Sequence, residues 1–184
     1  MLEIKISGGK YWDENAEIFY DIPGAVLKLE HSLISISKWE AKWKKPFASA
    51  DKKTYEETID YIKCMTITPN VSDDIYRCMD DETIDKITAY IEDPMTATWF
   101  SDSQMNNSNK RIGSEVVTSE LVYYWMFSFN IPIELEKWHF NRLMTLIKIF
   151  SIKNQEPKKM SRAELAARNR SLNAQRLKKY KTKG

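Results

Sequence analysis

The hydrophobic positions of residues 118–152 predict two helices joined by a short corner. The segment begins with Thr118 and Ser119, residue types that cap helix N-termini by accepting hydrogen bonds from free backbone N–H groups. Pro132 follows Asn130 and cannot continue a helix, so it marks the corner. After the corner, the apolar positions approach a 3.6-residue period: Leu135, Trp138, Leu143, Leu146, Ile147 and Phe150. We expect this central helical hairpin to supply much of the core.

Alternating apolar and polar residues near the N-terminus predict strands instead. Residues 2–7 and 17–22 show this alternation, and residues 26–29 can form a third strand. The pairs Gly8-Gly9 and Pro23-Gly24 break the pattern, as expected of turns. A small antiparallel sheet is therefore expected at the N-terminus.

Helical spacing dominates residues 32–92. A first helix is expected from residue 32 to the break at Lys45-Pro46. Thr54-Tyr55-Glu56-Glu57 has the capping-box pattern, which predicts a second helix. The side chains expected to face the core from that helix are Tyr55, Ile59, Ile62 and Met65. Two shorter helices are expected at residues 72–79 and 81–92.

A β-hairpin is expected between these helices and the central hairpin. Residues 95–100, Met-Thr-Ala-Thr-Trp-Phe, are rich in strand-forming types, and residues 111–117 can form the returning strand. The turn-forming residues 105–110 predict a mobile loop between them.

Charge separates the C-terminal segment from the rest of the chain. The 184 residues carry a formal net charge of +2, with 28 basic and 26 acidic side chains. Residues 153–184 hold eleven Lys and Arg against Glu156 and Glu164, a charge of +9. The first 152 residues keep the other 17 basic and 24 acidic side chains, a charge of −7. A mildly acidic body thus carries a strongly basic tail.

The sequence of the tail predicts a linker followed by a helix. Residues 153–160 are polar and contain Pro157, and the capping-box pattern at residues 161–164 predicts a helical start. The tail residues expected to contact a partner are Arg162, Arg168, Arg170, Arg176, Lys178 and Lys179. Such a helix can dock on a protein, or it can bind nucleic acid by neutralising phosphates. The protein partner is favoured, because Tyr180 is the only aromatic residue after Phe150 that could stack on a base. We expect the tail to be dispensable for folding of the body.

Together these patterns predict an α+β fold. We expect a predominantly helical body over residues 1–152, with a small antiparallel N-terminal sheet and the central helical hairpin. A linker at 153–160 and a basic C-terminal helix at 161–184 complete the expected organisation. The N-terminus lacks the apolar stretch of a signal peptide, and the most hydrophobic window, 121–133, is too short to span a bilayer. A soluble intracellular protein that does not bind membranes is therefore expected.

The sequence offers weak signals for catalysis or metal binding. Glu136 and His139 have the Glu-x-x-His spacing, but a di-metal helical bundle needs a second such pair, and His31 does not supply it. Ser7-Gly8-Gly9-Lys10 lacks the remaining residues of a phosphate loop. Cys64 has no nucleophile motif around it. We therefore expect neither an enzyme nor a bound metal or cofactor.

Aromatic residues are the candidates for a protein-binding surface. Trp39 and Trp43 lie one helical turn apart, a spacing that fits a core stripe or, if exposed, a partner site. The candidate partner-binding residues are Trp39, Trp43, Tyr123, Tyr124 and Trp138.

Several segments of the chain resemble the tail assembly chaperones of tailed bacteriophages. These segments are residues 29–33 (Leu-Glu-His-Ser-Leu), 37–40, 45–47, 54–65, 95–100, 120–126, 136–143 (beginning Glu-Lys-Trp-His) and 168–176. The resemblance implies a non-enzymatic protein of the host cytoplasm. Such a protein keeps the tape-measure protein soluble and helps tail-tube subunits to polymerise around it. The alternatives are a nucleic-acid-associated phage protein acting through the basic tail, or a structural component of the virion. The resemblance does not cover the first 28 residues.

Overall fold

The computed structural model describes residues 1–13, 17–49, 51–100, 116–154 and 162–180. The chain divides into two compact units, Met1–Lys153 and Asn154–Gly184. The first unit combines antiparallel strands with helices, and helices predominate, so the predicted α+β class is confirmed. The expected boundary after residue 152 lies one residue before the observed division. The expected linker at residues 155–160 and the capping residue Ser161 lie outside the described residues.

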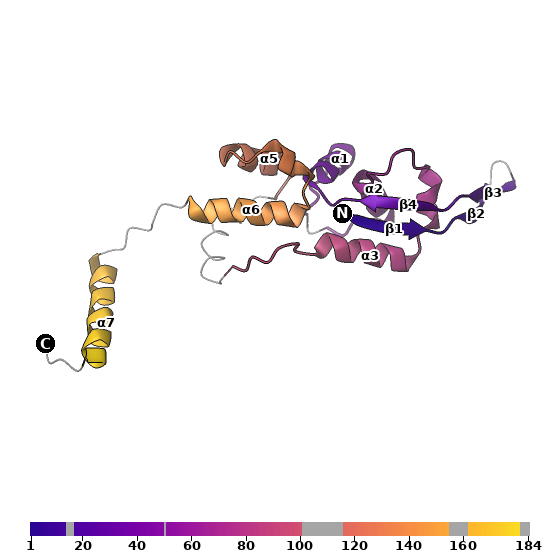
Figure 1. Ribbon diagram of the computed structural model, residues 1–184. Coiled ribbons are helices and arrows are strands. Elements are labelled where there is room, and N and C mark those ends of the chain that lie inside the picture. Colours follow the sequence, from indigo (N-terminus) through magenta and orange to yellow (C-terminus); the bar gives the residue numbers. More distant parts are fainter. Residues whose placement is uncertain (14–16, 50, 101–115, 155–161, 181–184) are drawn as a thin grey trace. The chain divides into compact units, whose positions relative to one another are not determined.

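The N-terminal strands form one long antiparallel hairpin with a break in its ladder (Figure 1). β1 (Leu2–Ile6) pairs with β4 (Ala25–Leu29), and β2 (Gly9–Asp13) pairs with β3 (Ile18–Ile22). The register is continuous across the break, since the residue numbers of each pair, such as Ile6 with Ala25 and Gly9 with Ile22, add to 31. The predicted strands are confirmed, whereas β2 was not predicted because its first residue, Gly9, had been taken as part of a turn.

Gly8 is required at the break by the close approach of the two chain segments. A Cβ atom at Gly8 would lie 2.1 Å from the carbonyl oxygen of Ile22, which leaves no room for any other residue. A Cβ atom at Gly24 would lie 2.9 Å from the carbonyl oxygen of Ile6. The glycines therefore let the backbones meet where the ladder is interrupted. Gly9 and Lys10 continue into a strand, so this segment does not open a helix as a phosphate loop does.

Alternation of side chains places one face of β1 and β4 in the first core cluster. Ile4, Ile6, Leu27 and Leu29 are buried, while the residues between them point to solvent. The helices that supply the other side of this cluster are α1 (Leu33–Trp43), α2 (Tyr55–Met65), η1 (Asp73–Cys78) and α3 (Asp81–Glu92). Their N-terminal residues are capped by the side chains of Ser32, Thr54, Ser72 and Asp80.

The predicted inward orientation of Tyr55 in α2 is wrong, whereas Ile62 and Met65 are buried as expected. Tyr55 is 65% exposed, and Glu57 occupies the inward position of the first turn. The Glu57 carboxylate accepts a hydrogen bond from the backbone N–H of Thr54 and pairs with the Lys45 ammonium at 2.6 Å. Helix capping thus decides which side chain of this turn is buried.

The expected β-hairpin after α3 is not found in the described residues. Residues 95–100 belong to no helix or strand and have no strand partner there, so the predicted strand at this position is wrong. Residues 105–110 and all of the expected returning strand except Val116 and Val117 lie outside the described residues, and these two are not in a strand. The Asn141 side chain fixes the start of this segment by donating hydrogen bonds to the carbonyls of Ile91 and Asp93, at 2.9 and 2.8 Å.

The central helical hairpin is confirmed, with one change in its second half. α5 (Ser119–Ser128) leads through the corner at Pro132 to η2 (Ile133–Lys137) and then to α6 (Phe140–Lys153). The second helix was expected to begin at residue 134. It begins later because His139 pairs with Ser32 in an isolated bridge and Phe140 N–H donates to the carbonyl of His31 at 2.7 Å. These helices enclose a second core cluster: Leu33, Val122, Met126, Ile131, Leu143 and Ile147.

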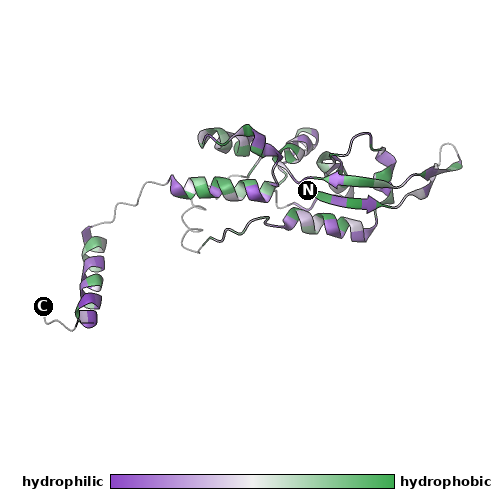
Figure 2. Cartoon of the chain, in the orientation of Figure 1, coloured by the Kyte–Doolittle hydropathy of each residue, from purple (hydrophilic) through white to green (hydrophobic). Residues whose placement is uncertain are grey.

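The second unit contains the basic helix α7 (Arg162–Tyr180). Its described side chains are exposed, including those of Leu165, Leu172 and Leu177. Figure 2 shows this helix as mainly hydrophilic with isolated hydrophobic positions. Among the described residues, no helix combines the length and the hydrophobicity that are needed to cross a membrane.

Candidate functional site

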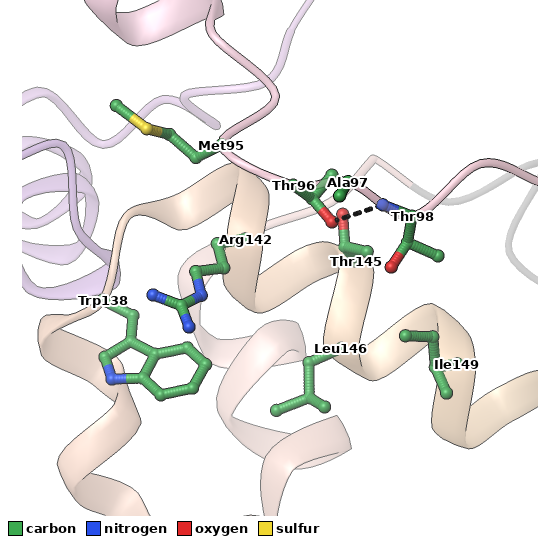
Figure 3. A pocket seen from close by; sticks show the side chains of 9 residues that line it. All are labelled: Met95, Thr96, Ala97, Thr98, Trp138, Arg142, Thr145, Leu146 and Ile149. Atoms are coloured by element: carbon green, nitrogen blue, oxygen red, sulfur yellow. Dashed lines mark hydrogen bonds between the residues drawn. The ribbon is translucent and has the colours of Figure 1, made fainter.

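A pocket lies between residues 95–98 and one face of α6 (Figure 3). Its volume is about 350 Å³. The residues lining it are Met95, Thr96, Ala97, Thr98, Trp138, Arg142, Thr145, Leu146 and Ile149. The α6 residues have the i, i+3, i+4, i+7 spacing of a single helix face, so the helix itself brings them together. Leu146 also packs against the second core cluster, which ties the pocket floor to the core.

The backbone after α3 turns sharply to reach this face. Met95 has a φ of 49°, in the left-handed region that residues with a Cβ atom rarely adopt. Its N–H donates to the Asp93 carboxylate at 2.7 Å, which stabilises the turn. The next local bond runs from Thr98 N–H to the Thr96 hydroxyl at 3.1 Å. Local side-chain contacts thus hold residues 95–98 beside α6 without a strand ladder.

Arg142 is the charged group of the pocket. Its guanidinium carbon lies 4.2 Å from the centroid of the Trp138 ring, a cation–π arrangement that orients the planar group. No described residue forms an ion pair or hydrogen bond with the Arg142 side chain. Lys148 lies on the same helix as Arg142, and its ammonium is 4.4 Å from the centroid of the Phe100 ring. The pocket therefore combines apolar and hydroxyl-bearing side chains with an oriented cation whose donors are not engaged by the described chain.

The predicted partner-binding aromatics lie in different environments. Trp138 lines the pocket, and Tyr124 is 64% exposed. Trp39 is 2% exposed and its indole N–H donates to the carbonyl of Glu57 at 2.8 Å, so Trp39 belongs to the core and cannot form a surface. Trp43 is half-buried against it, with 6.3 Å between the ring centroids.

Tyr123 is half-buried and links the two halves of the helical hairpin. Its hydroxyl donates to the Glu136 carboxylate at 2.8 Å. Burial, followed by this bond to a carboxylate, raises the pKa of Tyr123 well above its usual value. The Glu136 carboxylate is therefore hydrogen-bonded to Tyr123 of α5.

Several exposed aromatic residues were missed by sequence reasoning. Trp99 is 91% exposed, Phe127 is 67% exposed and Phe19 is 68% exposed. Phe19 faces Trp12 across β2 and β3, with 4.8 Å between the ring centroids. Trp99 had been assigned to a paired strand, and the exposed side of α5 cannot be identified from its nearly uniform hydrophobic sequence. Contiguous apolar patches left open to solvent are typical of protein-binding sites, and Phe127 lies one helical turn from the exposed Tyr124 on α5.

The two histidines form a buried pair that neither residue's sequence context had indicated. Their rings meet edge to face with 5.0 Å between centroids. His31 is hydrogen-bonded to the Tyr61 hydroxyl, and His139 Nε2–H donates to the carbonyl of Tyr90 at 3.0 Å. Burial, then the neighbouring His139, lowers the pKa of His31 to about 3, and burial also lowers that of His139. Both imidazoles are neutral at pH 7.

The described residues contain no cluster of three or more His, Cys, Asp or Glu that could hold a metal ion. Cys64 is half-buried, and burial, followed by the charge of Asp60, raises its pKa. A raised pKa disfavours the thiolate that a nucleophilic cysteine needs. Among the described residues of the first unit, the open aromatic side chains and the pocket at Arg142 are the candidates for binding another molecule.

The six basic residues predicted for partner contact all lie on α7 and are exposed: Arg162, Arg168, Arg170, Arg176, Lys178 and Lys179.

Comparison of the chain with protein-family models, curated proteins and solved structures gives no match.

Proposed function

We propose that this protein is a non-enzymatic tail assembly chaperone of a tailed bacteriophage, acting in the host cytoplasm. In this role it binds the tape-measure protein, keeps it soluble and assists polymerisation of tail-tube subunits. The phage context rests on the resemblance described for the sequence. The binding role rests on the molecule itself.

The observation that carries the binding role is the exposure of large aromatic side chains on a body that also has a well-formed core. Trp99, Tyr124 and Phe127 are each more than 60% exposed, at 91%, 64% and 67%. Exposing such groups to water is unfavourable, by roughly 25 cal/mol for each Å² of apolar surface that a partner would bury. A protein that covers aggregation-prone helices needs this kind of surface, and it needs no convergent set of titratable groups.

The test of this function is co-expression with the tape-measure protein of the same phage. We expect the tape-measure protein to remain soluble with the wild-type chain and to precipitate with the triple variant Trp99→Ser, Tyr124→Ser, Phe127→Ser. A matched triple variant at exposed polar positions, Lys38→Ser, Glu56→Ser and Lys86→Ser, is expected to behave as wild type. Precipitation with wild type, or full solubility with the aromatic variant, contradicts the proposal.

Helix α7 supports a second candidate function, binding of nucleic acid. Its six basic side chains are exposed along one helix, and phosphate neutralisation by Lys and Arg is independent of sequence. Nucleic-acid binding through α7 should weaken steeply between about 50 and 200 mM salt. A structural role in the virion is the remaining alternative, and the protein would then be found in purified particles.

A chain ending at Asn154 separates these functions. We expect it to melt at the temperature of the full chain, because the described side chains of α7 are exposed and exposed ion pairs contribute about 0–1 kcal/mol each. Loss of tape-measure binding in this variant assigns α7 to the chaperone role. Loss of salt-sensitive DNA binding with tape-measure binding intact favours the second function.

A further inference from the structure

The backbone of residues 96–100, after the turn at Met95, is an edge without a backbone partner in the described chain. The N–H groups of Thr96, Ala97, Trp99 and Phe100 make no backbone hydrogen bond to another described segment. Four of these five residues, Thr96, Thr98, Trp99 and Phe100, are nevertheless of types that favour a strand. Edges of this kind accept an additional strand from a binding partner, whose main chain supplies the missing hydrogen bonds.

The pocket beside this edge has the size of a site for one or two side chains of such a partner. It runs along α6 from Arg142 to Ile149, about 10 Å at 1.5 Å per residue. An extended peptide covers that distance with about three residues, of which alternate side chains face the same way. Leu146 and Ile149 offer apolar contact at one end, and Arg142 stands at the other (Figure 3).

The Arg142 guanidinium determines which chemical group of a ligand the pocket can bind. Its guanidinium is stacked on Trp138, which leaves the N–H donors at its planar edge free for an acceptor outside the described chain. A carboxylate matches this edge with two parallel hydrogen bonds, and such charge-assisted pairs are about twice as strong as neutral ones.

We infer that the pocket between residues 95–98 and α6 binds an extended segment of a protein partner, with a carboxylate side chain on Arg142 and an apolar side chain beside Leu146 and Ile149. This inference rests on the proposed protein-binding function and names the chemistry of the segment that is bound. In the chaperone role, that segment belongs to the tape-measure protein.

The inference is tested with end-blocked, fluorescein-labelled peptides of the sequence Ser-Thr-Val-Glu-Leu-Thr-Ser and its Gln counterpart. Binding is measured by fluorescence anisotropy, and the indole N–H signal of Trp138 is followed by NMR. We expect the Glu peptide to bind wild type about tenfold more tightly than the Gln peptide and to shift the Trp138 signal. This preference should disappear in Arg142→Gln and be partly kept in Arg142→Lys.

Lys153→Gln, at the exposed end of the same helix, is the matched control and should keep the full preference. Absence of saturable binding to wild type, or an unchanged Glu preference in Arg142→Gln, overturns the inference. Soluble tape-measure protein without peptide discrimination overturns this inference and leaves the proposed function standing. Peptide discrimination without soluble tape-measure protein supports the pocket and overturns the chaperone role.

Discussion

His31 and His139 come from opposite ends of the body's sequence and meet edge to face inside it, with 5.0 Å between ring centroids. His31 lies between β4 and α1, and His139 immediately precedes α6. Phe140, beside them, packs against both core clusters. The histidine pair therefore lies where the two clusters join, and its protonation affects how both are held together.

The first prediction is that the body loses stability on acidification before its carboxylates titrate. The pKa of His31 is about 3 in the folded protein and about 6.5 when unfolded, so the unfolded state binds more protons between these values. The contribution of neutral His31 to the free energy of unfolding is fully present above pH 6.5. Below that pH it falls by about 1.4 kcal/mol for each pH unit. Urea denaturation at pH 7.5, 6.0 and 5.0 measures this slope.

Because the chain has two histidines, NMR provides a direct control. The His31 imidazole should not titrate between pH 8 and 5 in the folded protein, and the pKa of the His139 imidazole should lie below its usual value. The lowered pKa of Glu57, caused first by its bond with Lys45, adds a loss of stability as pH falls below about 4.5, so it does not overlap this window. A histidine that titrates near pH 6.5 while the protein stays folded contradicts the prediction.

The second prediction concerns Glu40, which links three segments from inside the body. It is 8% exposed, and its carboxylate accepts hydrogen bonds from Phe47 N–H at 2.7 Å and from Ser119 N–H at 2.8 Å. Glu40→Ala leaves both buried donors without an acceptor, and we expect a loss of about 2–4 kcal/mol in unfolding free energy. Chemical denaturation measures it, with the exposed Glu56→Ala as a control expected to stay within about 0.5 kcal/mol of wild type.

The third prediction compares two adjacent glycines. Gly8→Ala should destabilise the body by about 2 kcal/mol or more, since its Cβ atom would lie 2.1 Å from the Ile22 carbonyl oxygen. Gly9→Ala should change stability by less than about 1 kcal/mol, because its Cβ atom would meet Cys78 Sγ at an ordinary 3.5 Å. Equal melting temperatures for the two variants would show that the close approach at the break is not needed.

The fourth prediction is a gain in stability at the end of α1. Lys44 adopts a left-handed conformation, with φ 55° and ψ 33°, which glycine adopts without steric cost. Lys44→Gly should raise the unfolding free energy by about 0.5–1 kcal/mol. Lys38→Gly, in the middle of the same helix and also exposed, should lower it by about 1 kcal/mol. A loss of stability in both variants contradicts the prediction.

Periodicity and capping residues were sufficient to predict most of the elements. The Thr54–Glu57 capping box, the alternation in β1 and the corner at Pro132 depend on contacts within a few residues, so the local sequence determines them. The start of α6 could not be predicted in this way. It depends on Ser32 and His31, which meet His139 and Phe140 only after the chain has folded.

The candidate site shows the same division between local and long-range information. Trp138 could be selected from its residue type, but Arg142 became a candidate only through its stacking on Trp138 and its place beside residues 95–98. Trp39 could be a core residue or, if exposed, a partner-binding residue, because a helical aromatic stripe has the same spacing in both cases. Its burial depends on α2, where the carbonyl of Glu57 accepts its indole N–H.

The interrupted ladder of the N-terminal hairpin divides its hydrogen exchange into two regimes. The amides of β1 and β4 are covered by the first core cluster, so they should exchange only when the body unfolds. β2 and β3 continue beyond β1 and β4 (Figure 1) and carry the exposed pair Trp12 and Phe19. Their amides should exchange through a local opening that begins at Gly8 and Gly24, many times faster than those of the inner strands. The outer half of this hairpin can then open and close while the core of the protein remains intact.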